Sequence, residues 1–162
     1  MLNKLKSSYH IHTLIRQSNR RNLASNKIKI RNIIFVNDSK ATSFEATKYA
    51  LLNSRNIYWI LGGLAKKGDK LNLNKKYFKK IKAYIYGTNK AFFLNVLKNK
   101  CRLHSSKNLK DILSKLFLDI KKNKNGKKTI LFSPAAASFD QFKNFEERGR
   151  YFNQLLKKYI NA

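Results

Sequence analysis

The stretch that decides the fold is Thr129-Ile130-Leu131-Phe132-Ser133-Pro134-Ala135-Ala136-Ala137-Ser138-Phe139-Asp140-Gln141-Phe142-Lys143-Asn144-Phe145-Glu146-Glu147-Arg148-Gly149. Its first four residues are an apolar run that predicts a buried strand, and residues 142–160 predict a helix. The small residues between them form a turn at the carboxyl end of that strand, where open α/β sheets bind ligands. Because a helix start presents free N–H groups, the sequence predicts an anion-accepting loop here.

A similar unit occurs earlier in the chain. Residues 33–36 are wholly apolar and rich in β-branched side chains, which predicts a strand buried on both faces. Residues 37–42 then form the loop at its carboxyl end, and Ser43 is suited to cap a helix at 44–52. By residue pattern alone, an ordinary turn with an Asx-type bond from Asp38 is the simpler interpretation of this loop.

The second central strand is predicted at residues 57–61 and ends at Gly62-Gly63. Paired glycines permit positive φ and close approach of backbones. Lys66 and Lys67 follow in this loop, and two lysines there are most simply solvated charges. The chain nowhere contains the Gly-x-x-x-x-Gly-Lys-Ser/Thr pattern of a phosphate-binding P-loop.

The remaining segments continue the alternation of strands and helices. We predict a short basic helix at 74–81, a strand at 83–86, a helix at 89–98, an edge strand at 101–103 and a helix from 106 to 120. The expected core residues of the helix at 89–98 are Ala91, Leu94 and Leu97. Those of the next helix are Leu109, Ile112, Leu113, Leu116, Phe117 and Ile120, and those of the last helix are Phe142, Phe145, Phe152, Leu155, Leu156 and Tyr159.

This order of elements predicts an α/β fold, a Rossmann-like, mainly parallel open sheet flanked by helices. The turns after the strands meet at one edge of such a sheet, where a binding site is expected. Residues 1–30 contain no acid, glycine or proline and are predicted to be a basic, poorly ordered segment, which leaves 31–162 as the domain. A transit peptide has a similar composition. His10 and His12 have no third ligand nearby, so we predict no metal site.

The charge of the chain is strongly positive. It has 36 Lys and Arg against 8 Asp and Glu, a net charge of +28. Such a charge is typical of nucleic-acid binding, but the lysines are spread along every element, which favours biased composition as the cause. We therefore expect no specific nucleic-acid partner. The absence of a membrane-length apolar run predicts a soluble protein with no membrane partner, and the single cysteine, Cys101, suits a reducing cytoplasm.

Three stretches, in order, resemble one family. They are residues 37–42 (Asn-Asp-Ser-Lys-Ala-Thr), Leu61-Gly62-Gly63 with Lys66 and Asp69, and residues 133–149. Together they resemble the C-terminal domain of the Mur ligases that add D-glutamate to UDP-N-acetylmuramoyl-L-alanine. The resemblance covers residues 31 to 162. Five of the eight acids of this acid-poor chain lie inside the three stretches: Asp38, Asp69, Asp140, Glu146 and Glu147.

The resemblance implies a bacterial, cytoplasmic enzyme of peptidoglycan precursor synthesis. Such ligases use ATP and Mg²⁺ to phosphorylate a substrate carboxylate, and the amine of D-glutamate then attacks the acyl phosphate to give an amide. Their C-terminal domain binds the amino acid. The ATP-binding loop and Mg²⁺ ligands lie in a central ATPase domain, and the UDP-sugar pocket lies in an N-terminal domain. We find neither in this chain, so we expect it to be inactive alone, as a separate domain or the tail of an interrupted gene.

The resemblance also implies roles for particular residues. Those expected to bind D-glutamate are Thr42, Lys66, Ser138, Phe139 through its backbone, and Phe145 as an aromatic wall. Asp38 and Lys40 match positions close to the phosphates and the nucleotide, and no residue is expected to bind a metal. Three alternatives stay open: a sibling Mur or folylpolyglutamate-type ligase domain, a basic nucleic-acid-binding domain, and a folded remnant without activity.

Overall fold

The computed structural model describes residues 26–123 and 125–161. Its strands are β1 (Asn26–Ile30), β2 (Ile33–Asn37), β3 (Ile57–Gly62), β4 (Ile81–Tyr86), β5 (Arg102–Ser105) and β6 (Lys128–Phe132). Its helices are α2 (Phe44–Leu52), α3 (Lys75–Phe78), α4 (Lys90–Leu97), α5 (Leu109–Lys122) and α6 (Phe145–Asn161). His10 and His12 lie outside the described residues.

The strands form one six-stranded sheet in the order β1-β2-β6-β3-β4-β5. Every neighbouring pair is parallel except β1 with β2, which is antiparallel. This confirms the predicted mainly parallel α/β fold. Residues 26–30, expected to belong to the basic segment before the domain, instead form β1, with Ile30 opposite Ile33. They pair because a tight turn, in which Arg31 has a φ of 53°, folds them back onto β2.

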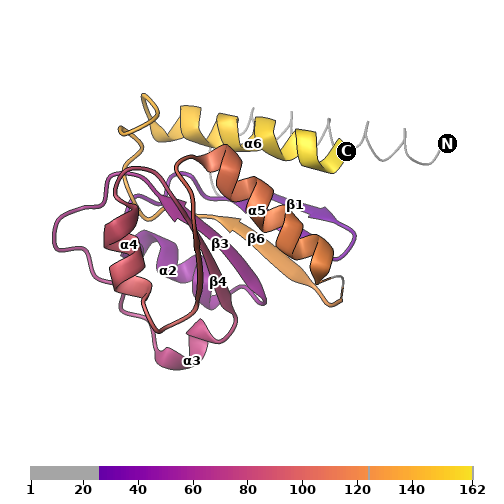
Figure 1. Cartoon of the computed structure of the whole chain (residues 1–162), viewed down its shortest axis with the longest axis horizontal. Coiled ribbons are helices and arrows are strands. Elements are labelled where there is room, and N and C mark those ends of the chain that lie inside the picture. The colour runs from indigo at the N-terminus through magenta and orange to yellow at the C-terminus, as the bar shows by residue number, and fades with distance from the viewer. Residues whose placement is uncertain (1–25, 124, 162) are drawn as a thin grey trace.

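Helices cover both faces of the sheet (Figure 1). One core joins α5 and α6 to side chains such as Tyr58, Tyr84 and Phe132. The other joins α2, α3 and α4 to side chains such as Trp59 and Leu131 on the opposite face. Because alternate residues of a strand point to opposite faces, the wholly buried β3 and β6 contribute to both cores.

Helix α2 agrees with the prediction in both its bounds and its cap. It spans Phe44–Leu52, and the Ser43 hydroxyl accepts a hydrogen bond from the backbone N–H of Ala46. An Ncap side chain of this kind contributes about 1 kcal/mol to helix stability. The helix begins here because Ser43 has an extended backbone conformation and supplies the acceptor that a free N–H of the first turn needs.

Four other helix predictions need correction. The helix predicted from 106 to 120 is Leu109–Lys122, because the Asn108 side chain supplies its cap. The helix predicted at 74–81 is only Lys75–Phe78, because Ile81 already pairs with Ile57 in the sheet. The buried side chains of α4 are Phe93 and Leu97, whereas Ala91 is exposed. The Phe93 ring, and not Ala91, packs into the core on this face of the sheet. The last helix begins at Phe145 rather than Phe142.

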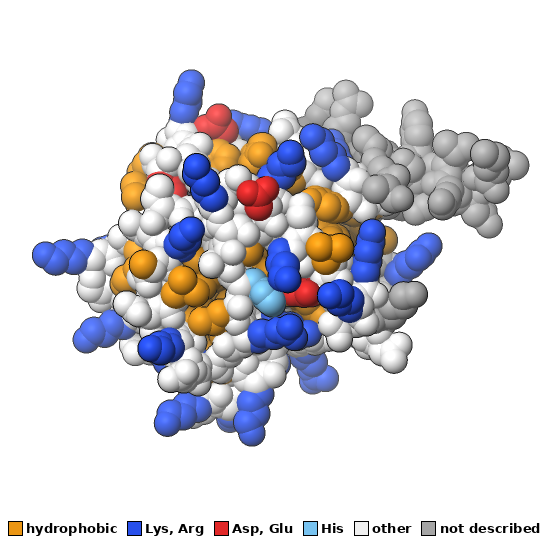
Figure 2. Space-filling view, in the orientation of Figure 1, with side chains coloured by type: hydrophobic (Ala, Val, Ile, Leu, Met, Phe, Trp, Pro, Cys, Tyr) orange, Lys and Arg blue, Asp and Glu red, His pale blue; other side chains and the backbone are white. Residues whose placement is uncertain are grey.

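The surface carries cations on all sides of the visible face (Figure 2). Lysine and arginine side chains are scattered among white and orange atoms and do not gather into one block. Their distribution on this face agrees with the even spread of lysines along the sequence.

Candidate functional site

The candidate site lies where three neighbouring strands end. β2, β6 and β3 are adjacent and parallel, so their carboxyl ends lie at the same edge of the sheet. The chain leaves β2 toward α2 on one face and leaves β6 toward α6 on the other. Where connections diverge in this way, open α/β sheets usually bind their ligands at the strand ends.

The loop after β2 is joined to the loop after β6. The Ala135 N–H donates to the carbonyl of Ala41 at 3.0 Å, and the Asp38 N–H donates to the carbonyl of Phe132 at 2.7 Å. The Ser133 hydroxyl donates to Asp38 Oδ2 at 2.9 Å. Main-chain and side-chain bonds therefore fix these two loops against each other.

The loop after β3 is joined to the same loop after β6. Leu64 and Ala137 exchange two backbone hydrogen bonds of 2.9 and 3.0 Å, and the Gly62 N–H donates to the carbonyl of Pro134 at 3.0 Å. Gly63 has a φ of +125°, and a Cβ atom on it would lie 2.3 Å from the carbonyl oxygen of Ala137. This approach of two backbones therefore requires glycine.

Asp69 joins the loop after β3 to the start of α2. Its Oδ2 accepts a hydrogen bond of 2.8 Å from the N–H of Phe44, the first residue of α2. A carboxylate at a helix start satisfies a free N–H and complements the helix dipole. Asp69 thereby ties the loop that carries Lys66 to the helix that follows Thr42.

The predicted D-glutamate ligands lie next to these contacts. Thr42 follows Ala41, Ser138 follows Ala137, and Lys66 is two residues beyond Leu64. The structure thus brings together the three loops that carry them. Thr42 and Lys66 are exposed and Ser138 is buried. In the described part of the chain, no hydrogen bond or ion pair engages these three side chains.

The other predicted residues surround the same edge. Phe139 is 70% exposed, and Phe145 is half-buried at the start of α6, where its carbonyl accepts a hydrogen bond from the Ser39 hydroxyl. Lys40 is exposed. Asp38 differs because it is half-buried and engaged: burial raises the pKa of its carboxyl group, and the hydrogen bond from Ser133 opposes that rise.

The start of α6 is not the open anion site that the sequence predicts. The Glu147 N–H donates to Asn144 Oδ1 at 2.8 Å, and Glu147 Oε2 accepts from the Lys143 N–H at 2.7 Å. Glu146 is also in the first turn. This reciprocal capping satisfies N–H groups and places negative charge where an anion was expected.

Sequence reasoning missed the role of Arg148. It is 0% exposed and donates from Nε to Ser39 Oγ (3.1 Å), from Nη2 to the Ser39 carbonyl (2.7 Å) and from Nη1 to the Ala136 carbonyl (2.9 Å). One signal was available. Arg148 lies four and seven residues before Phe152 and Leu155, which places it on the buried face of α6.

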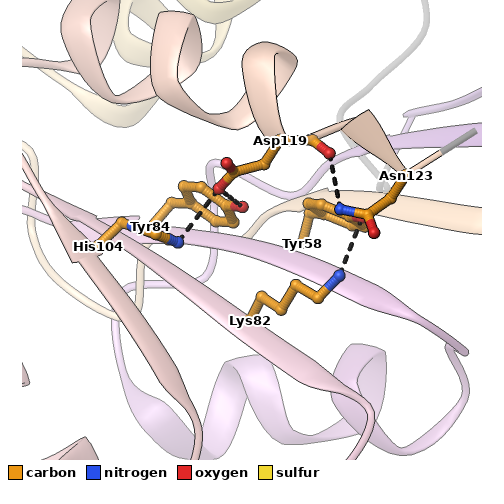
Figure 3. A network of polar contacts seen from close by, with 6 residues as sticks. All are labelled: Tyr58, Lys82, Tyr84, His104, Asp119 and Asn123. Carbon is orange, nitrogen blue, oxygen red and sulfur yellow. Dashed lines mark hydrogen bonds and ion pairs between the residues drawn. The ribbon is translucent and has the colours of Figure 1, made fainter. Parts of the chain in front are cut away.

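A second polar cluster lies on the α5 side of the sheet (Figure 3). Asp119 Oδ2 lies 3.1 Å from His104 Nε2 and accepts a hydrogen bond of 2.8 Å from the Tyr84 hydroxyl. The Tyr84 ring stacks on His104 with centroids 4.9 Å apart. Lys82 Nζ donates to the Tyr58 hydroxyl at 3.1 Å. Tyr58 and Lys82 are the second residues of β3 and β4, so the cluster extends toward the end of the sheet opposite the loops.

Neither a metal-binding cluster nor a membrane-spanning helix occurs in residues 26–123 and 125–161. No group of three or more His, Cys, Asp or Glu side chains there is placed to hold a metal ion. No helix of that region is both long and apolar enough to span a membrane.

The sheet topology and the three joined loops define a Rossmann-like α/β domain with a candidate site at the carboxyl ends of its central strands. No protein-family model matches the chain. The chain is 45% identical over 130 residues, 80% of its length, to the UDP-N-acetylmuramoylalanine–D-glutamate ligase of Wolbachia sp. subsp. Brugia malayi (strain TRS). It is 42% identical over 131 residues to the ligase of the same name from Rickettsia prowazekii (strain Madrid E), and 40% identical over 120 residues to that from Rhizobium meliloti (strain 1021).

These matches show that the chain is homologous to a segment of UDP-N-acetylmuramoylalanine–D-glutamate ligases. The chain spans 26%, 29% and 26% of the lengths of these three relatives, or about a quarter of each.

Proposed function

We propose that the chain is the C-terminal, amino-acid-binding domain of an ATP-dependent ligase that joins D-glutamate to UDP-N-acetylmuramoyl-L-alanine in bacterial, cytoplasmic peptidoglycan synthesis. One observation carries the proposal: three loops that each present a free donor side chain are hydrogen-bonded to one another at the carboxyl edge of the sheet. The similarity to D-glutamate ligases supports D-glutamate over the substrates of sibling Mur or folylpolyglutamate-type ligases.

The chemistry of D-glutamate suits these donors. The molecule has two carboxylates and one ammonium group, so a binding site needs at least two cationic or N–H-rich positions at a fixed separation. We assign one carboxylate to Lys66 Nζ. We assign the other to the hydroxyls of Thr42 and Ser138 with the N–H of Phe139, and the aromatic wall to Phe145. A hydrogen bond to a charged group contributes about 1.5–3 kcal/mol.

The nucleotide is assigned mainly to other parts of the ligase. When bound, ATP with Mg²⁺ supplies the phosphoryl group that activates the carboxylate of UDP-N-acetylmuramoyl-L-alanine. Lys40, an exposed cation, is suited to a phosphate, whereas Asp38 Oδ2 already accepts from Ser133 and is suited to holding its loop. We assign the Mg²⁺ ligands and the UDP-sugar pocket to the central ATPase domain and the N-terminal domain.

Replacement of Lys66 tests the proposed function. Lys66→Ala removes one charge-assisted hydrogen bond and is expected to weaken D-glutamate binding about tenfold or more, because about 1.4 kcal/mol corresponds to a factor of ten. The measurement is an NMR titration of the labelled chain with D-glutamate and L-glutamate at physiological salt. Lys67→Ala, which removes the neighbouring exposed lysine, is the matched control. Equal D-glutamate affinity for Lys66→Ala and the parent would refute the assignment of Lys66.

The same titration separates the proposal from binding driven by charge alone. A net charge of +28 is sufficient for non-specific attraction to polyanions, which weakens steeply as salt increases. We therefore add a short DNA duplex as a second ligand. Salt-sensitive shifts spread over the lysines, with no response to D-glutamate, would favour the nucleic-acid alternative over the ligase domain. The scattered cations on the visible face are unlike the single basic patch of a dedicated nucleic-acid-binding surface (Figure 2).

A further inference from the structure

Arg148 contacts two of the three loops of the candidate site by hydrogen bonds and approaches the third. It donates to Ser39 in the loop after β2 and to Ala136 in the loop after β6. A Cβ atom built on Gly63, in the loop after β3, would lie 3.2 Å from Arg148 Nη1. One side chain of α6 therefore reaches every segment that carries a proposed D-glutamate ligand.

The guanidinium group is held mainly by neutral oxygen atoms. Among the described residues no carboxylate forms a salt bridge with it, and two of its three acceptors are backbone carbonyls. Burial lowers the pKa of Arg148, and the neighbouring Tyr86 and Asp140 oppose that change. Arg148 keeps its charge even so, because a guanidinium group is too basic to lose its proton in a protein. A buried cation that donates to loop backbone stabilises one arrangement of those loops, since any other leaves its N–H groups without acceptors.

The shape of the guanidinium group is as important as its charge. Nε, Nη1 and Nη2 point in fixed directions within one plane, so their three acceptors are held at fixed mutual positions. A lysine ammonium group at the same place keeps the charge but has no planar fork. The separation between the Thr42 loop and the Ser138 loop therefore depends on arginine.

We propose that Arg148 is a positioning residue that sets the relative placement of the Thr42, Lys66 and Ser138 loops, and so determines discrimination between D-glutamate and L-glutamate. The ligand part of this inference rests on the proposed function. D- and L-glutamate carry the same charges, and they differ only in the directions of their groups. A preference between them reports the geometry of the site and not its charge.

The test compares Arg148→Lys with Arg150→Lys in the full 162-residue chain. Arg150 lies on the same helix and is exposed, so its replacement controls for the chemistry of the substitution. We expect Arg148→Lys to weaken D-glutamate binding about tenfold or more and to bring the D-over-L preference close to one, because small displacements of binding groups cost this much. Arg150→Lys is expected to keep the parent values.

Amide hydrogen exchange measures the loops without any ligand. The N–H groups of Leu64, Ala135 and Ala137 form the hydrogen bonds between loops, whereas those of Trp59 and Leu131 lie in the sheet. In Arg148→Lys the first group is expected to exchange about tenfold faster relative to the second. Equal acceleration of both groups would mean that Arg148 only stabilises the fold, and would overturn the proposal.

Three further variants separate positioning from loss of stability. Ile112→Val and Leu116→Ala weaken the core under α5, away from the loops. Where their melting temperatures match that of Arg148→Lys, they are expected to keep the D-over-L preference of the parent.

Ser39→Ala removes one acceptor of Arg148. It should reduce the D-over-L preference partly, and this can be measured even if Arg148→Lys does not fold. Loosened loops with an unchanged D-over-L preference would overturn the link to the ligand. If the parent chain binds no D-glutamate, the proposed function fails and hydrogen exchange alone decides whether Arg148 positions the loops.

Discussion

Asp38 holds its negative charge in a half-buried position, and this has a measurable cost. Burial raises the pKa of its carboxyl group above 3.8, so the folded state disfavours the ionised form. The penalty is present at neutral pH and is relieved as the pH falls toward 3.8. Asparagine keeps an oxygen for the Ser133 hydroxyl but carries no charge.

We therefore predict that Asp38→Asn raises the melting temperature at pH 7 and that this gain disappears near pH 4. Thermal unfolding at both pH values measures it. Glu45→Gln, which neutralises an exposed acid of α2, is the control and should change little. Lower stability of Asp38→Asn at pH 7 would contradict the prediction. A charged group kept where it destabilises the fold is typical of functional sites.

His104 is expected to make stability depend on pH. Burial lowers its pKa below 6.5, the Asp119 charge opposes this, and Arg102, Lys115 and Lys82 reinforce it. The folded state therefore favours the neutral imidazole. Its contribution to stability is fully present above pH 6.5 and is lost as the pH falls through the lowered folded value.

We therefore predict that, as the pH falls from 7.5 to 5, the parent chain loses more stability than His104→Gln does. Thermal unfolding of both chains across this range gives the difference, and NMR titration of the imidazole gives its pKa directly. A pKa of 6.5 or more in the folded chain, or a gain in relative stability at pH 5, would show that attraction to Asp119 dominates over burial.

Individual residues differ in how far the sequence predicts them. The positions of Lys66 and Ser138 after strands follow from the sequence, whereas their roles as ligands come from the family resemblance and stay predictions. The contacts of Asp69 and Arg148 do not follow from the sequence, because they depend on which groups the fold brings near them: the N–H of Phe44 for Asp69 and the carbonyls of Ser39 and Ala136 for Arg148. Two of the motif acids also make structural contacts: Asp69 accepts a hydrogen bond from the first N–H of α2, and Glu147 accepts one from the Lys143 N–H just before α6.

The glycine-rich end of β3 determines whether two loops can touch. Gly63→Ala would place a Cβ atom 2.3 Å from the Ala137 carbonyl oxygen and would break the pair of hydrogen bonds between Leu64 and Ala137. We predict a loss of about 2 kcal/mol from these two bonds, on top of the cost of positive φ. Gly126→Ala isolates the second cost, because Gly126 has a φ of +77° and no atom within 4 Å of an added Cβ. That cost is about 1–2 kcal/mol.

Urea unfolding of both glycine variants and titration with D-glutamate test this prediction. Gly63→Ala should lose D-glutamate affinity as well as stability, whereas Gly126→Ala should keep its affinity. Equal stability of the two variants would show that the loops adapt to the added methyl group.

The bounds of helices and strands are predicted well where a capping residue stands next to the apolar pattern. They are predicted less well where contacts with other elements determine them. α2 is predicted to the residue because Ser43 supplies a cap immediately before an apolar pattern. α6 is predicted three residues too early because Phe142 extends the apolar pattern, while the cap at Asn144 and Glu147 fixes the actual start. The predicted strand at 83–86 begins two residues earlier, at Ile81, because Ile81 and Lys82 pair with β3.

The order of the strands is a property of the whole molecule that no local pattern contains. β6, the last strand in the chain, inserts between β2 and β3, which are consecutive in sequence. Alternation of strands and helices predicts the fold class, but this insertion depends on pairings between residues about a hundred positions apart, such as Asn37 with Phe132. The same insertion brings the motif of residues 133–149 between the other two motifs and creates the site.

The isolated chain lacks the sequence pattern that binds the phosphates of ATP in P-loop enzymes. In the described part of the chain, no acidic cluster is placed to hold Mg²⁺. Phosphoryl transfer depends on positioning the phosphates and neutralising the charge that develops on them. We therefore predict no ATP hydrolysis above background by the isolated chain, with or without D-glutamate, in a phosphate-release assay with Mg²⁺. The control is the chain joined to the rest of the ligase of Wolbachia sp. subsp. Brugia malayi, of which it spans 26%, and this assembly should restore release that depends on both D-glutamate and UDP-N-acetylmuramoyl-L-alanine. Lys66→Ala should raise the D-glutamate concentration needed for half-maximal rate in that assembly about tenfold. Turnover by the chain alone would overturn the assignment of nucleotide chemistry to other domains, because the groups responsible would then have to lie within these 162 residues.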